Sequence, residues 1–477
     1  MRVSEYFKLG RTQPTLDFVD VDIVDDTPLF IDPRALSDFS SEWTDECVLV
    51  VQDFFQEVLE AIRKGQHSRA RKLLSTLREP NETHLGLSKG QSKGRGLGRE
   101  SAFNVWESLT TSEAAKSGLL EDLEDTILMV PGISSDIISD ITTNLIRRQL
   151  IEYTLEQARY HDIPLSPGVD SGILWNPLTH RWYSEYARLP MTPAGKLLLI
   201  PKIIVRKQLT YDVDEYFNYY ILERLQEVEL AANSDLVELL RNGKRRVTKK
   251  DSKEKYGTGK STVVAITKLY PALLEDYRKD KAGSVPPPLS HTDIAYSDGT
   301  EPPDWDALLS AVTTIPTGKT HASDYEKAVE SLLTALFYPS LTNPKVQHEI
   351  HRGRKRIDIT YVNYAQSGFF YWVGQHYPAS HVFIECKNYT NDIANPELDQ
   401  LSGRFSPKRG QIGLLVCRKF DNKKLFIERC IDTANDSRGY IVVLDDADLL
   451  DLIEARKQEW KSPKFELLQI RFEELIM

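Results

Sequence analysis

The stretch HVFIECKNY, His381 to Tyr389, is the part of this 477-residue chain that best indicates its fold. Its apolar residues predict a buried β-strand, yet Glu385 and Lys387 stand inside it. Side chains of a strand alternate between its two faces, so these two residues share one face and Cys386 points to the other. Charged groups in an apolar strand are costly unless they are satisfied, so we expect this strand to carry chemistry.

Helical and strand patterns alternate around this strand. SDYEKAVESLLTALF predicts a helix with one apolar stripe, and Ser323 and Glu326 are spaced as a capping box. The other expected elements follow in chain order: a hairpin around Arg352 to Arg354, the strand above, a helix in NPELDQLSGRF, a strand in QIGLLVCRKF, a helix over 423–434 and a strand in YIVVLDD. This order predicts an α/β/α layered domain with a mixed central sheet over residues 321–477.

Asp358, in the segment RKRIDI, precedes Glu385-Cys386-Lys387 by one predicted strand. This pattern and its element order resemble the PD-(D/E)XK, or restriction-endonuclease-like, nuclease superfamily over about one third of the chain. The chain departs from the name-giving motif at Ile357, where proline would stand, and in the 26 residues between the two acidic positions. The resemblance implies a restriction-endonuclease-like fold and an endonuclease activity.

Asp358 and Glu385 are the expected metal ligands. If they lie side by side on neighbouring strands, two carboxylates converge on one hard cation, which suits Mg²⁺ and also Mn²⁺. Such a cation polarises a scissile phosphate and lowers the pKa of bound water, while Lys387 would hold that water and offset charge at phosphorus. We therefore expect a Mg²⁺-dependent endonuclease that hydrolyses phosphodiester bonds of DNA, with RNA as an open alternative.

Two residues are candidates for a third carboxylate. Glu326 lies on the first helix, where related nucleases often place an acid, but its capping-box position also gives it a structural reason to exist. Glu349 would lie across from Asp358 if the hairpin closes with a two-residue turn at Gly353-Arg354. A register change of one residue would move it to the opposite face, and the choice between the two acids stays open.

Other polar and aromatic residues surround the expected site. Gln400 and Arg404, four residues apart on a helix, resemble the polar position that this superfamily directs at its active site, and an ordinary exposed helix face is the alternative. The aromatic segment between Asp358 and Glu385 is expected to pack as an added strand or to stack unpaired bases. Basic residues that could grip a substrate backbone crowd the hairpin turn: Arg352, Arg354, Lys355 and Arg356.

Upstream, residues 1–162 and 163–282 read as two regions of α/β or α+β type whose fold is unknown, the first a possible recognition or sensor region. TILMVPGI, Thr126 to Ile133, predicts a strand, and Ser134 or Ser135 caps a helix that runs to about Tyr160. Strands are expected over Leu197 to Val205 and a helix over 213–230. The proline-rich segment 283–320 predicts a linker.

Charge is distributed unevenly along the chain. The net charge of −10 argues weakly against a nucleic-acid partner, but residues 241–260 contain nine basic and two acidic residues. This segment permits contact with phosphates, and a solvated loop is the alternative. The string YGTGKST, Tyr256 to Thr262, echoes a Walker A loop, but Glu254 stands where its first glycine belongs and no apolar strand precedes it, so ATP binding is not expected.

The four cysteines show no CxxC pair, and no stretch approaches 18 uninterrupted apolar residues. With no secretory pattern at the start, these features predict a cytoplasmic protein without a membrane span. We expect a restriction-like or antiviral defence effector whose upstream regions recognise a target or trigger, and a homodimer or higher oligomer because one such site cuts one strand. Two alternatives stay open: a nucleic-acid-binding or scaffolding protein with a degenerate nuclease domain, and a nuclease that repairs branched DNA.

Overall fold

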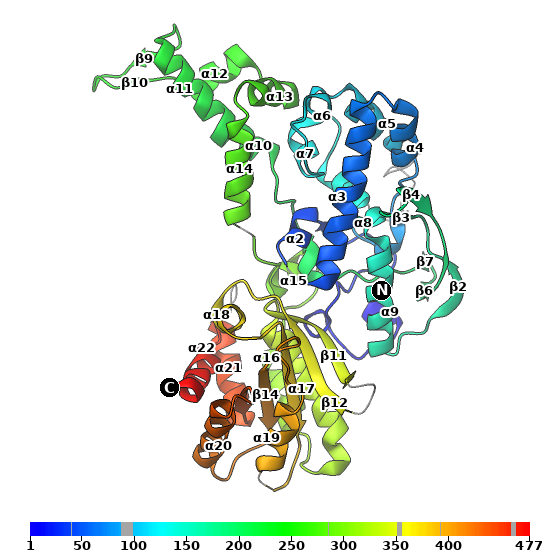
Figure 1. Ribbon diagram of the computed structural model, residues 1–477, viewed down its shortest axis with the longest axis vertical. Coiled ribbons are helices and arrows are strands. Elements are labelled where there is room, and N and C mark those ends of the chain that lie inside the picture. The colour runs from blue at the N-terminus through cyan, green and yellow to red at the C-terminus, as the bar shows by residue number, and fades with distance from the viewer. Residues whose placement is uncertain (40, 87–98, 285, 351–354, 392, 459–463) are drawn as a thin grey trace.

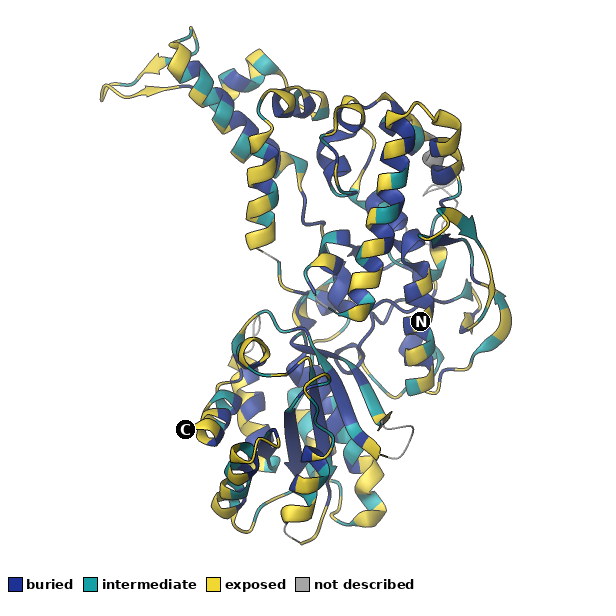
Figure 2. Ribbon diagram, viewed as in Figure 1, coloured by how far each residue is buried: buried dark blue, intermediate teal, exposed yellow. Residues whose placement is uncertain are grey.

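The computed structural model describes all residues except 40, 87–98, 285, 351–354, 392 and 459–463. An N-terminal lobe and a C-terminal lobe follow one another along the long axis, and an arm projects from the N-terminal lobe (Figure 1). One hydrophobic core consists mainly of residues between Val3 and Ile294, and a second of residues between Val312 and Leu475. Figure 2 shows the buried residues of both cores. Among the described residues, no helix has the length and hydropathy needed to cross a membrane.

Helices make up most of the N-terminal lobe. The longest is α3, Glu42–Arg63, and the hydroxyl of Ser41 caps it by accepting a hydrogen bond from the Thr44 N–H at 3.1 Å. The remaining helices are α1 Val3–Tyr6, α2 Pro33–Ser37, α4 His67–Leu74, α5 Arg99–Thr111, α6 Glu113–Ser117, α7 Asp125–Met129, α8 Ser135–Leu145 and α9 Arg147–Tyr160. The lobe is therefore built around helix packing rather than around a large sheet.

The predicted strand over Thr126 to Ile133 is wrong, because α7 occupies the first half of that segment and a turn follows it. The carboxylate of Asp125 accepts hydrogen bonds from the N–H groups of Glu121 and Asp122, at 2.9 and 3.1 Å, and this contact fixes the turn that starts the helix. An apolar run of this length does not separate a buried helix from a buried strand. The predicted cap at Ser134 is confirmed, but the following helix is divided into α8 and α9.

Strands in the N-terminal lobe are short and paired in twos. The pairs are β1 Phe30–Ile31 with β8 Val205–Arg206, β2 Ser166–Asp170 with β5 Tyr186–Leu189, β3 Leu174–Asn176 with β4 Arg181–Tyr183, and β6 Met191–Thr192 with β7 Gly195–Lys196. The strands predicted over Leu197 to Val205 are largely absent. Loops and side chains satisfy that buried backbone instead, as when Leu198 N donates to Glu82 O at 2.8 Å and Leu199 N to the Thr154 hydroxyl at 2.9 Å.

The arm is a group of helices with a small hairpin at its end (Figure 1). Its elements are α10 Val213–Tyr216, a π-helical turn Phe217–Ile221, α11 Leu222–Ala232, β9 Glu238–Leu239, β10 Arg245–Arg246, α12 Lys249–Tyr256, α13 Lys260–Leu269 and α14 Ala272–Gly283. The predicted helix over 213–230 is confirmed in this group.

The proline-rich segment 283–320, predicted as a linker, contains two helices. They are α15, His291–Asp298, and α16, Trp305–Thr313. Ser290 caps α15 and Asp304 caps α16, each by accepting a hydrogen bond from a backbone N–H three residues later. His291 and Val312 are buried, so the prolines flank packed helices and do not mark a free linker.

The C-terminal lobe is built on one mixed sheet of five strands in the order β11-β12-β13-β14-β15, with the first two pairings antiparallel and the last two parallel. The strands are β11 Leu341–Ile350, β12 Lys355–Asn363, β13 His381–Lys387, β14 Ile412–Cys417 and β15 Tyr440–Leu444. The helices of this lobe are α17 Ala322–Phe337, α18 Gly368–His376, α19 Asn395–Ser402, α20 Lys423–Asn435, α21 Asp446–Gln458 and α22 Glu466–Ile476. The predicted mixed α/β architecture is confirmed. Every residue of β14 is buried, so the middle of the sheet is covered on both faces.

The aromatic segment between Asp358 and Glu385 does not add a strand. It forms α18, in which Phe369, Phe370 and Val373 are buried while Tyr371 is 44% exposed, a helical pattern of burial. The predicted strands on either side of the hairpin are confirmed as β11 and β12. Arg352 and Arg354, predicted for its turn, lie outside the described residues.

Candidate active site

Asp358 on β12 and Glu385 on β13 lie on neighbouring antiparallel strands. The pairing of these strands ends at Ile359 and Ile384, and one more step of the same register brings Asp358 opposite Glu385. The Asp358 Oδ2 atom accepts a hydrogen bond from the Cys386 N–H at 2.8 Å. A carboxylate therefore satisfies a backbone group of β13 at the point where the ladder stops, and the two acidic side chains come together there.

Among the residues placed in the structure, hydrogen bonds to Glu385 reach one of its two carboxylate oxygens. Its side chain is fully buried, and the Lys387 ammonium, 10% exposed, donates to Glu385 Oε1 at 2.6 Å. The Gln400 amide on α19 donates to the same oxygen. Within the described part of the chain, the other oxygen, Oε2, has no hydrogen-bond partner. A buried carboxylate oxygen without a partner is unusual in a folded protein and is open to a ligand.

The surroundings of the two carboxyl groups shift their ionisation. Burial raises the pKa of Glu385 to about 7, and the negative charge of Asp358 adds to this effect against the pull of Lys387. Burial also raises the pKa of Asp358, although the hydrogen bond from Cys386 opposes it. Burial lowers the pKa of Lys387, but the charge and hydrogen bond of Glu385 together with the charge of Asp358 oppose it, and the net shift is upward. The two carboxyl groups, Asp358 and Glu385, therefore titrate together, and protonation of this pair begins close to neutral pH.

Glu326 on α17 does not form the capping box predicted for it. The helix begins at Ala322, so Ser323 already lies inside its first turn and is not the cap residue. The Glu326 Oε1 atom instead accepts a hydrogen bond from the Gln347 amide at 2.8 Å. Burial raises the pKa of Glu326 and the charge of Asp358 contributes in the same direction, so this acid lies within electrostatic reach of the site.

Gln347 on β11 is a site residue that the sequence pattern did not reveal. The ladder pairs Val346 with Ile359 and His348 with Ile357, so Gln347 lies between them, opposite Asp358. Its backbone φ of 49° is in the left-handed region, which residues other than glycine seldom adopt. A hydrogen bond from its side chain lowers the pKa of Asp358 as well as that of Glu326. Only the register of the hairpin could have identified this residue.

The expectation that Glu349 lies across from Asp358 is wrong. Glu349 pairs with Arg356 in the ladder, and the two side chains form an exposed ion pair at 3.0 Å. The prediction assumed a two-residue turn, whereas β11 ends at residue 350 and β12 begins at residue 355, so four residues connect them. The register shifts by two residues, which keeps Glu349 on its face but moves it away from Asp358.

The basic residues next to the site join the turn after α19 to β12. Arg404, expected on the same helix as Gln400, lies beyond the end of α19 at Ser402. Arg404 Nε donates to Arg356 O at 2.7 Å, and Lys355 Nζ donates to Gly403 O at 2.8 Å. The charge of Arg404 lowers the pKa of both Asp358 and Glu385. The helix that carries Gln400 is thus fixed beside the two acids, and part of the basic surface is used for that purpose.

The chain leading into α17 is fixed to the ends of the central strands. Asn388 lies directly after β13. Its side-chain amide donates to Pro316 O at 2.9 Å, and its backbone carbonyl oxygen accepts from Gly318 N at 2.8 Å. Arg418, directly after β14, donates to Thr313 O at 2.7 Å. These contacts set where α17 begins and therefore where Glu326 lies relative to the sheet.

The oxygen ligands at this site fit a hard divalent cation. In the described ranges, no three His, Cys, Asp or Glu side chains form a metal-binding group. Mg²⁺, however, is usually held by one or two carboxylates and completes its shell with water and substrate phosphate. Asp358 and Glu385 provide two carboxylates, and the Glu385 Oε2 atom, which has no partner in the described ranges, provides an open ligand atom.

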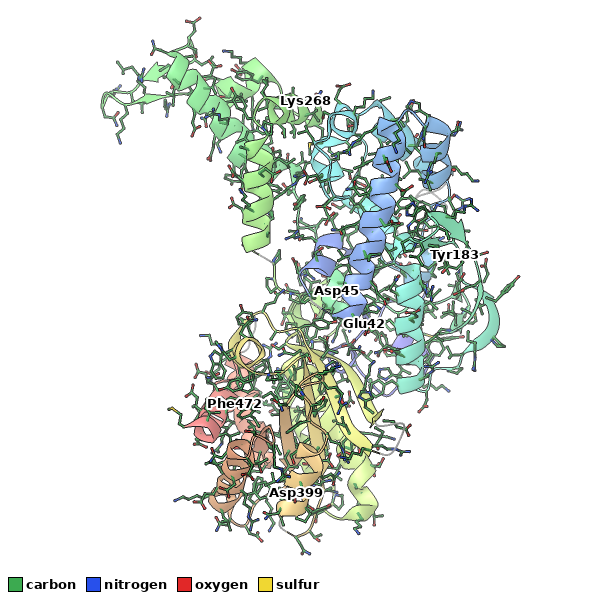
Figure 3. All side chains as sticks on the ribbon, viewed as in Figure 1. Glu42, Asp45, Tyr183, Lys268, Asp399 and Phe472 are labelled. Carbon is green, nitrogen blue, oxygen red and sulfur yellow. The ribbon has the colours of Figure 1, made fainter. Side chains whose placement is uncertain are left out.

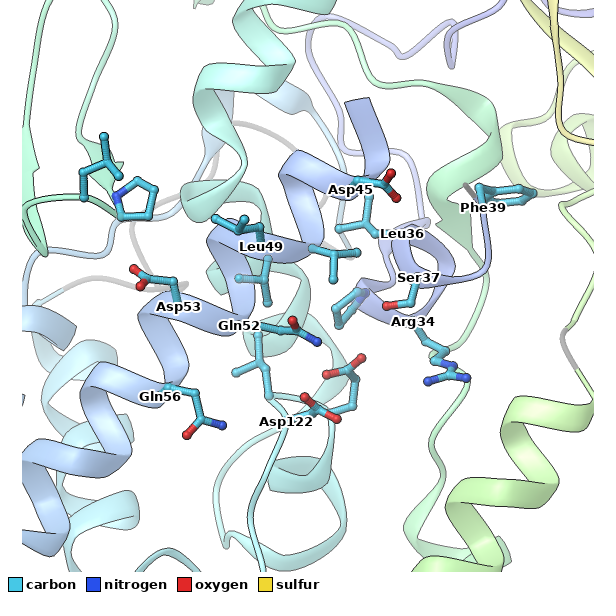
Figure 4. Close-up of a pocket in the computed structure, with 17 residues that line it drawn as sticks. Arg34, Leu36, Ser37, Phe39, Asp45, Leu49, Gln52, Asp53, Gln56 and Asp122 are labelled. Atoms are coloured by element: carbon cyan, nitrogen blue, oxygen red, sulfur yellow. The ribbon is translucent and has the colours of Figure 1, made fainter. Parts of the chain in front are cut away.

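A cavity of about 860 Å³ in the N-terminal lobe is separate from these residues (Figure 4). Its lining includes Asp45, Gln52 and Asp53 of α3 together with Asp122. Figure 3 shows Asp45 in the N-terminal lobe and Asp399, the neighbour of Gln400, near the far end of the C-terminal lobe. The cavity therefore does not contribute to the candidate site.

Residues 8–212 match the model of a family described as a domain of unknown function, DUF8370. The match covers most of the N-terminal lobe and ends before the arm and the C-terminal sheet. No curated protein and no solved structure matches the chain. The likeness is thus restricted to the lobe that does not carry Asp358 and Glu385.

Proposed function

We propose that residues 321–477 form a PD-(D/E)XK-like nuclease domain with a restriction-endonuclease-like fold, which hydrolyses phosphodiester bonds of DNA with Mg²⁺ or Mn²⁺. One observation carries this proposal: Asp358 and Glu385 meet at the end of a strand pairing, Lys387 contacts Glu385, and one buried Glu385 oxygen has no partner among the residues that the structure describes. The five-stranded mixed sheet supports the fold, since it brings the acids of two consecutive strands together.

Each residue has a distinct task in this proposal. Asp358 and Glu385 would hold the cation, which when bound polarises the scissile phosphate and lowers the pKa of a water molecule. Gln400 fixes Oε1 of Glu385 and thereby orients Oε2. Lys387, already beside the carboxylates, is placed to hold the attacking water and to offset negative charge on the phosphate. Glu326, oriented by Gln347, is a further acid at the margin of the site.

Cleavage of supercoiled DNA in the presence of Mg²⁺ tests the proposal. Lys387→Ala and Asp358→Ala should each lower the cleavage rate by roughly 10²–10³-fold, because the first removes a positive charge beside the reacting phosphate and the second removes a ligand of the cation. Glu349→Ala is the matched control, since it removes an exposed acid on the same hairpin and should cleave at the wild-type rate. Wild-type rates in both site variants would show that the site is wrongly assigned.

The form of the substrate is part of the same test. Linear, branched and single-stranded DNA and RNA should be compared at equal concentration. Preference for branched DNA would assign the activity to repair, and preference for RNA would replace DNA as the substrate.

A second candidate is a nucleic-acid-binding or scaffolding protein whose nuclease domain has lost its activity. The ion pair between Lys387 and Glu385 favours this candidate, because two buried charges that neutralise each other account for both residues without any catalytic role. Metal-independent binding, without cleavage of any DNA or RNA form in Mg²⁺ or Mn²⁺, would support this candidate over the first.

We further propose that the N-terminal lobe recognises a target or trigger, as in a restriction-like or antiviral defence effector. The support is its contact with the nuclease elements: Arg11 forms an ion pair at 2.6 Å with Glu330, which lies on α17 one helical turn from Glu326. A homodimer would allow both strands to be cut, because one such site cuts one strand. Sedimentation of the full chain with and without DNA tests the oligomeric state.

A further inference from the structure

The arm ends in a hairpin whose charge is opposite to that of the chain as a whole. Residues 241–250 contain six basic and no acidic residues, although the net charge of the protein is −10. Residues 241–246 are all exposed, and the β9–β10 pair projects from the end of the molecule opposite the C-terminal sheet (Figures 1 and 2). We refer to residues 238–250 as the basic hairpin.

Half of the six basic residues in the basic hairpin have no acidic partner in the part of the chain that the structure describes. Three of them do have one, at 3.0, 3.9 and 3.8 Å respectively: Arg246 with Glu238, Lys249 with Glu223 and Lys250 with Glu254. Across the described residues, Arg241, Lys244 and Arg245 form no ion pair, and Arg245 donates only to the amide oxygen of Asn233, at 3.0 Å. The unneutralised charge is therefore concentrated at the tip.

The base of the basic hairpin is fixed while its tip is exposed. Val247 is buried, and the Gln226 amide of α11 donates to its carbonyl oxygen. Leu240 N donates to Lys244 O at 2.9 Å, and this bond closes the turn. A ligand of the tip would not have to order the backbone first, which reduces the entropic cost of binding.

Lys260, the last basic residue of the sequence run, has a separate structural task. Its ammonium donates to Val130 O and Ile133 O, both at 2.8 Å, and so ties α13 to the segment after α7. Burial lowers the pKa of Lys260 to about 8. This contact gives the lysine of the YGTGKST string a structural role that needs no bound phosphate. Lys260 is therefore not part of the exposed basic surface at the tip of the hairpin.

We propose that the basic hairpin binds the backbone of double-stranded DNA, with its two strands entering the major groove. The major groove of B-DNA admits a two-stranded β-ribbon, whereas that of an RNA duplex is too narrow for one. The phosphates on either side attract lysine and arginine. This inference rests on the proposed function for the choice of DNA, and it gives the nuclease a second contact with its substrate at the end of the molecule opposite Asp358.

Binding of labelled duplex DNA in EDTA, followed by fluorescence anisotropy, tests the inference. The full-length variant with Arg241, Lys244 and Arg245 all changed to Ala should bind at least about tenfold more weakly, and the slope of log K against log salt should fall by about 2–3. The matched control changes Lys72, Lys116 and Lys424 to Ala, three exposed lysines without ion pairs in the described structure. It should bind as tightly as the wild type.

Wild-type affinity and salt slope in the hairpin variant would overturn the inference, as would equal binding of duplex RNA. Circular dichroism of the variant checks that it is folded. EDTA removes Mg²⁺, so this result does not depend on cleavage. DNA binding that needs the hairpin but is not followed by cleavage when Mg²⁺ is supplied would reject the nuclease site while leaving the hairpin in place.

Discussion

At the scale of single residues, Glu385 is the side chain whose state matters most. Its Oε1 atom accepts hydrogen bonds from Lys387 and Gln400, its Oε2 atom has no partner in the described structure, and its pKa is raised to about 7. A protonated carboxyl group is a poor ligand for Mg²⁺, so a proton and a cation compete for this group. Completion of the site therefore depends on pH near neutrality.

The cleavage rate at fixed, subsaturating Mg²⁺ should rise with pH up to about 7 and level off above it. Below its raised pKa, the ionised fraction of Glu385 falls about tenfold for each pH unit, so log rate should rise with a slope of at least one. Initial rates on supercoiled DNA across this range provide the measurement. A rate that stays level from about pH 5.5 to 7 would show that ionisation of Glu385 does not limit the reaction.

Gln400→Leu should move the pH profile to higher pH. The change removes a donor to the charged form of Glu385, and loss of such a hydrogen bond raises a carboxyl pKa further. The midpoint of the profile should shift while the rate at high pH recovers most of the wild-type value. Asp399→Ala, at the neighbouring exposed position on α19, is the control and should leave the midpoint in place. A uniform loss of rate without a shift would indicate a role in folding only.

At the scale of secondary-structure elements, packing of the loop after α19 supports β13. Phe405 stacks on Phe383, which lies two residues before Glu385 on β13, and the ring centroids are 5.8 Å apart. Gly439, just before β15, lies so close to the Phe405 ring that a Cβ atom there would overlap it, and its φ is 99°. The absence of a side chain at Gly439 thus allows the aromatic contact beneath β13.

Gly439→Ala should lower the free energy of unfolding by about 2–4 kcal/mol, because overpacking and a positive φ both oppose the new methyl group. Thermal unfolding provides the measurement. Gly283→Ala is the control: nothing lies within 4 Å of its added Cβ, its φ is ordinary, and its stability should stay within about 0.5 kcal/mol of wild type. Equal melting temperatures for both variants would mean that Phe405 moves aside without cost.

Sequence patterns predicted most of the C-terminal elements because local signals set them. Each strand from β13 to β15 contains a short apolar run, and alternation alone places Glu385 and Lys387 on one face. The aromatic segment that forms α18 was misread because a run such as Phe369-Phe370 suits a strand as well as a helix. The same ambiguity explains the errors at α7 and at Leu197 to Val205, where tertiary packing decides the backbone conformation.

The remainder of the candidate site depends on register, which the sequence did not disclose. The number of residues between β11 and β12 moves Glu349 away from Asp358 and brings Gln347 opposite it. Nothing in the local pattern signals the left-handed backbone of Gln347 or its bond to Glu326. The prolines of segment 283–320 led to the prediction of a linker for a related reason. The hydrogen bonds that cap α15 and α16 are evident in the folded structure and not in the sequence.

At the scale of the whole molecule, several contacts between the lobes lie on the two elements that border the site. Arg11 pairs with the buried Glu330 on α17. The Asp17 carboxylate accepts a hydrogen bond at 2.7 Å from the N–H of Asn343 on β11, the strand that carries Gln347. The N-terminal lobe thus touches the same helix and strand that orient Glu326, which is where a recognition event would have to act.

Arg11→Ala should destabilise the protein by about 3 kcal/mol, because it leaves Glu330 buried without its cation. The midpoint of urea unfolding provides the measurement, and Arg11→Ala combined with Glu330→Gln should recover part of the loss. Lys345→Ala is the control, since it breaks an exposed pair with Glu156 at 3.4 Å and should cost less than about 1 kcal/mol. A stable Arg11→Ala protein would show that this ion pair does not hold the lobes together.

The nuclease assignment requires one divalent cation between Asp358 and Glu385. Crystals soaked in Mn²⁺, examined by anomalous diffraction, test this most directly. We predict one peak about 2.1 Å from an oxygen of each carboxylate, and no peak in crystals of Asp358→Ala. The assignment would be contradicted if wild-type crystals bound Mn²⁺ elsewhere but showed no peak near Asp358 or Glu385. The hydrogen bond between Lys387 and Glu385 would then remain intact.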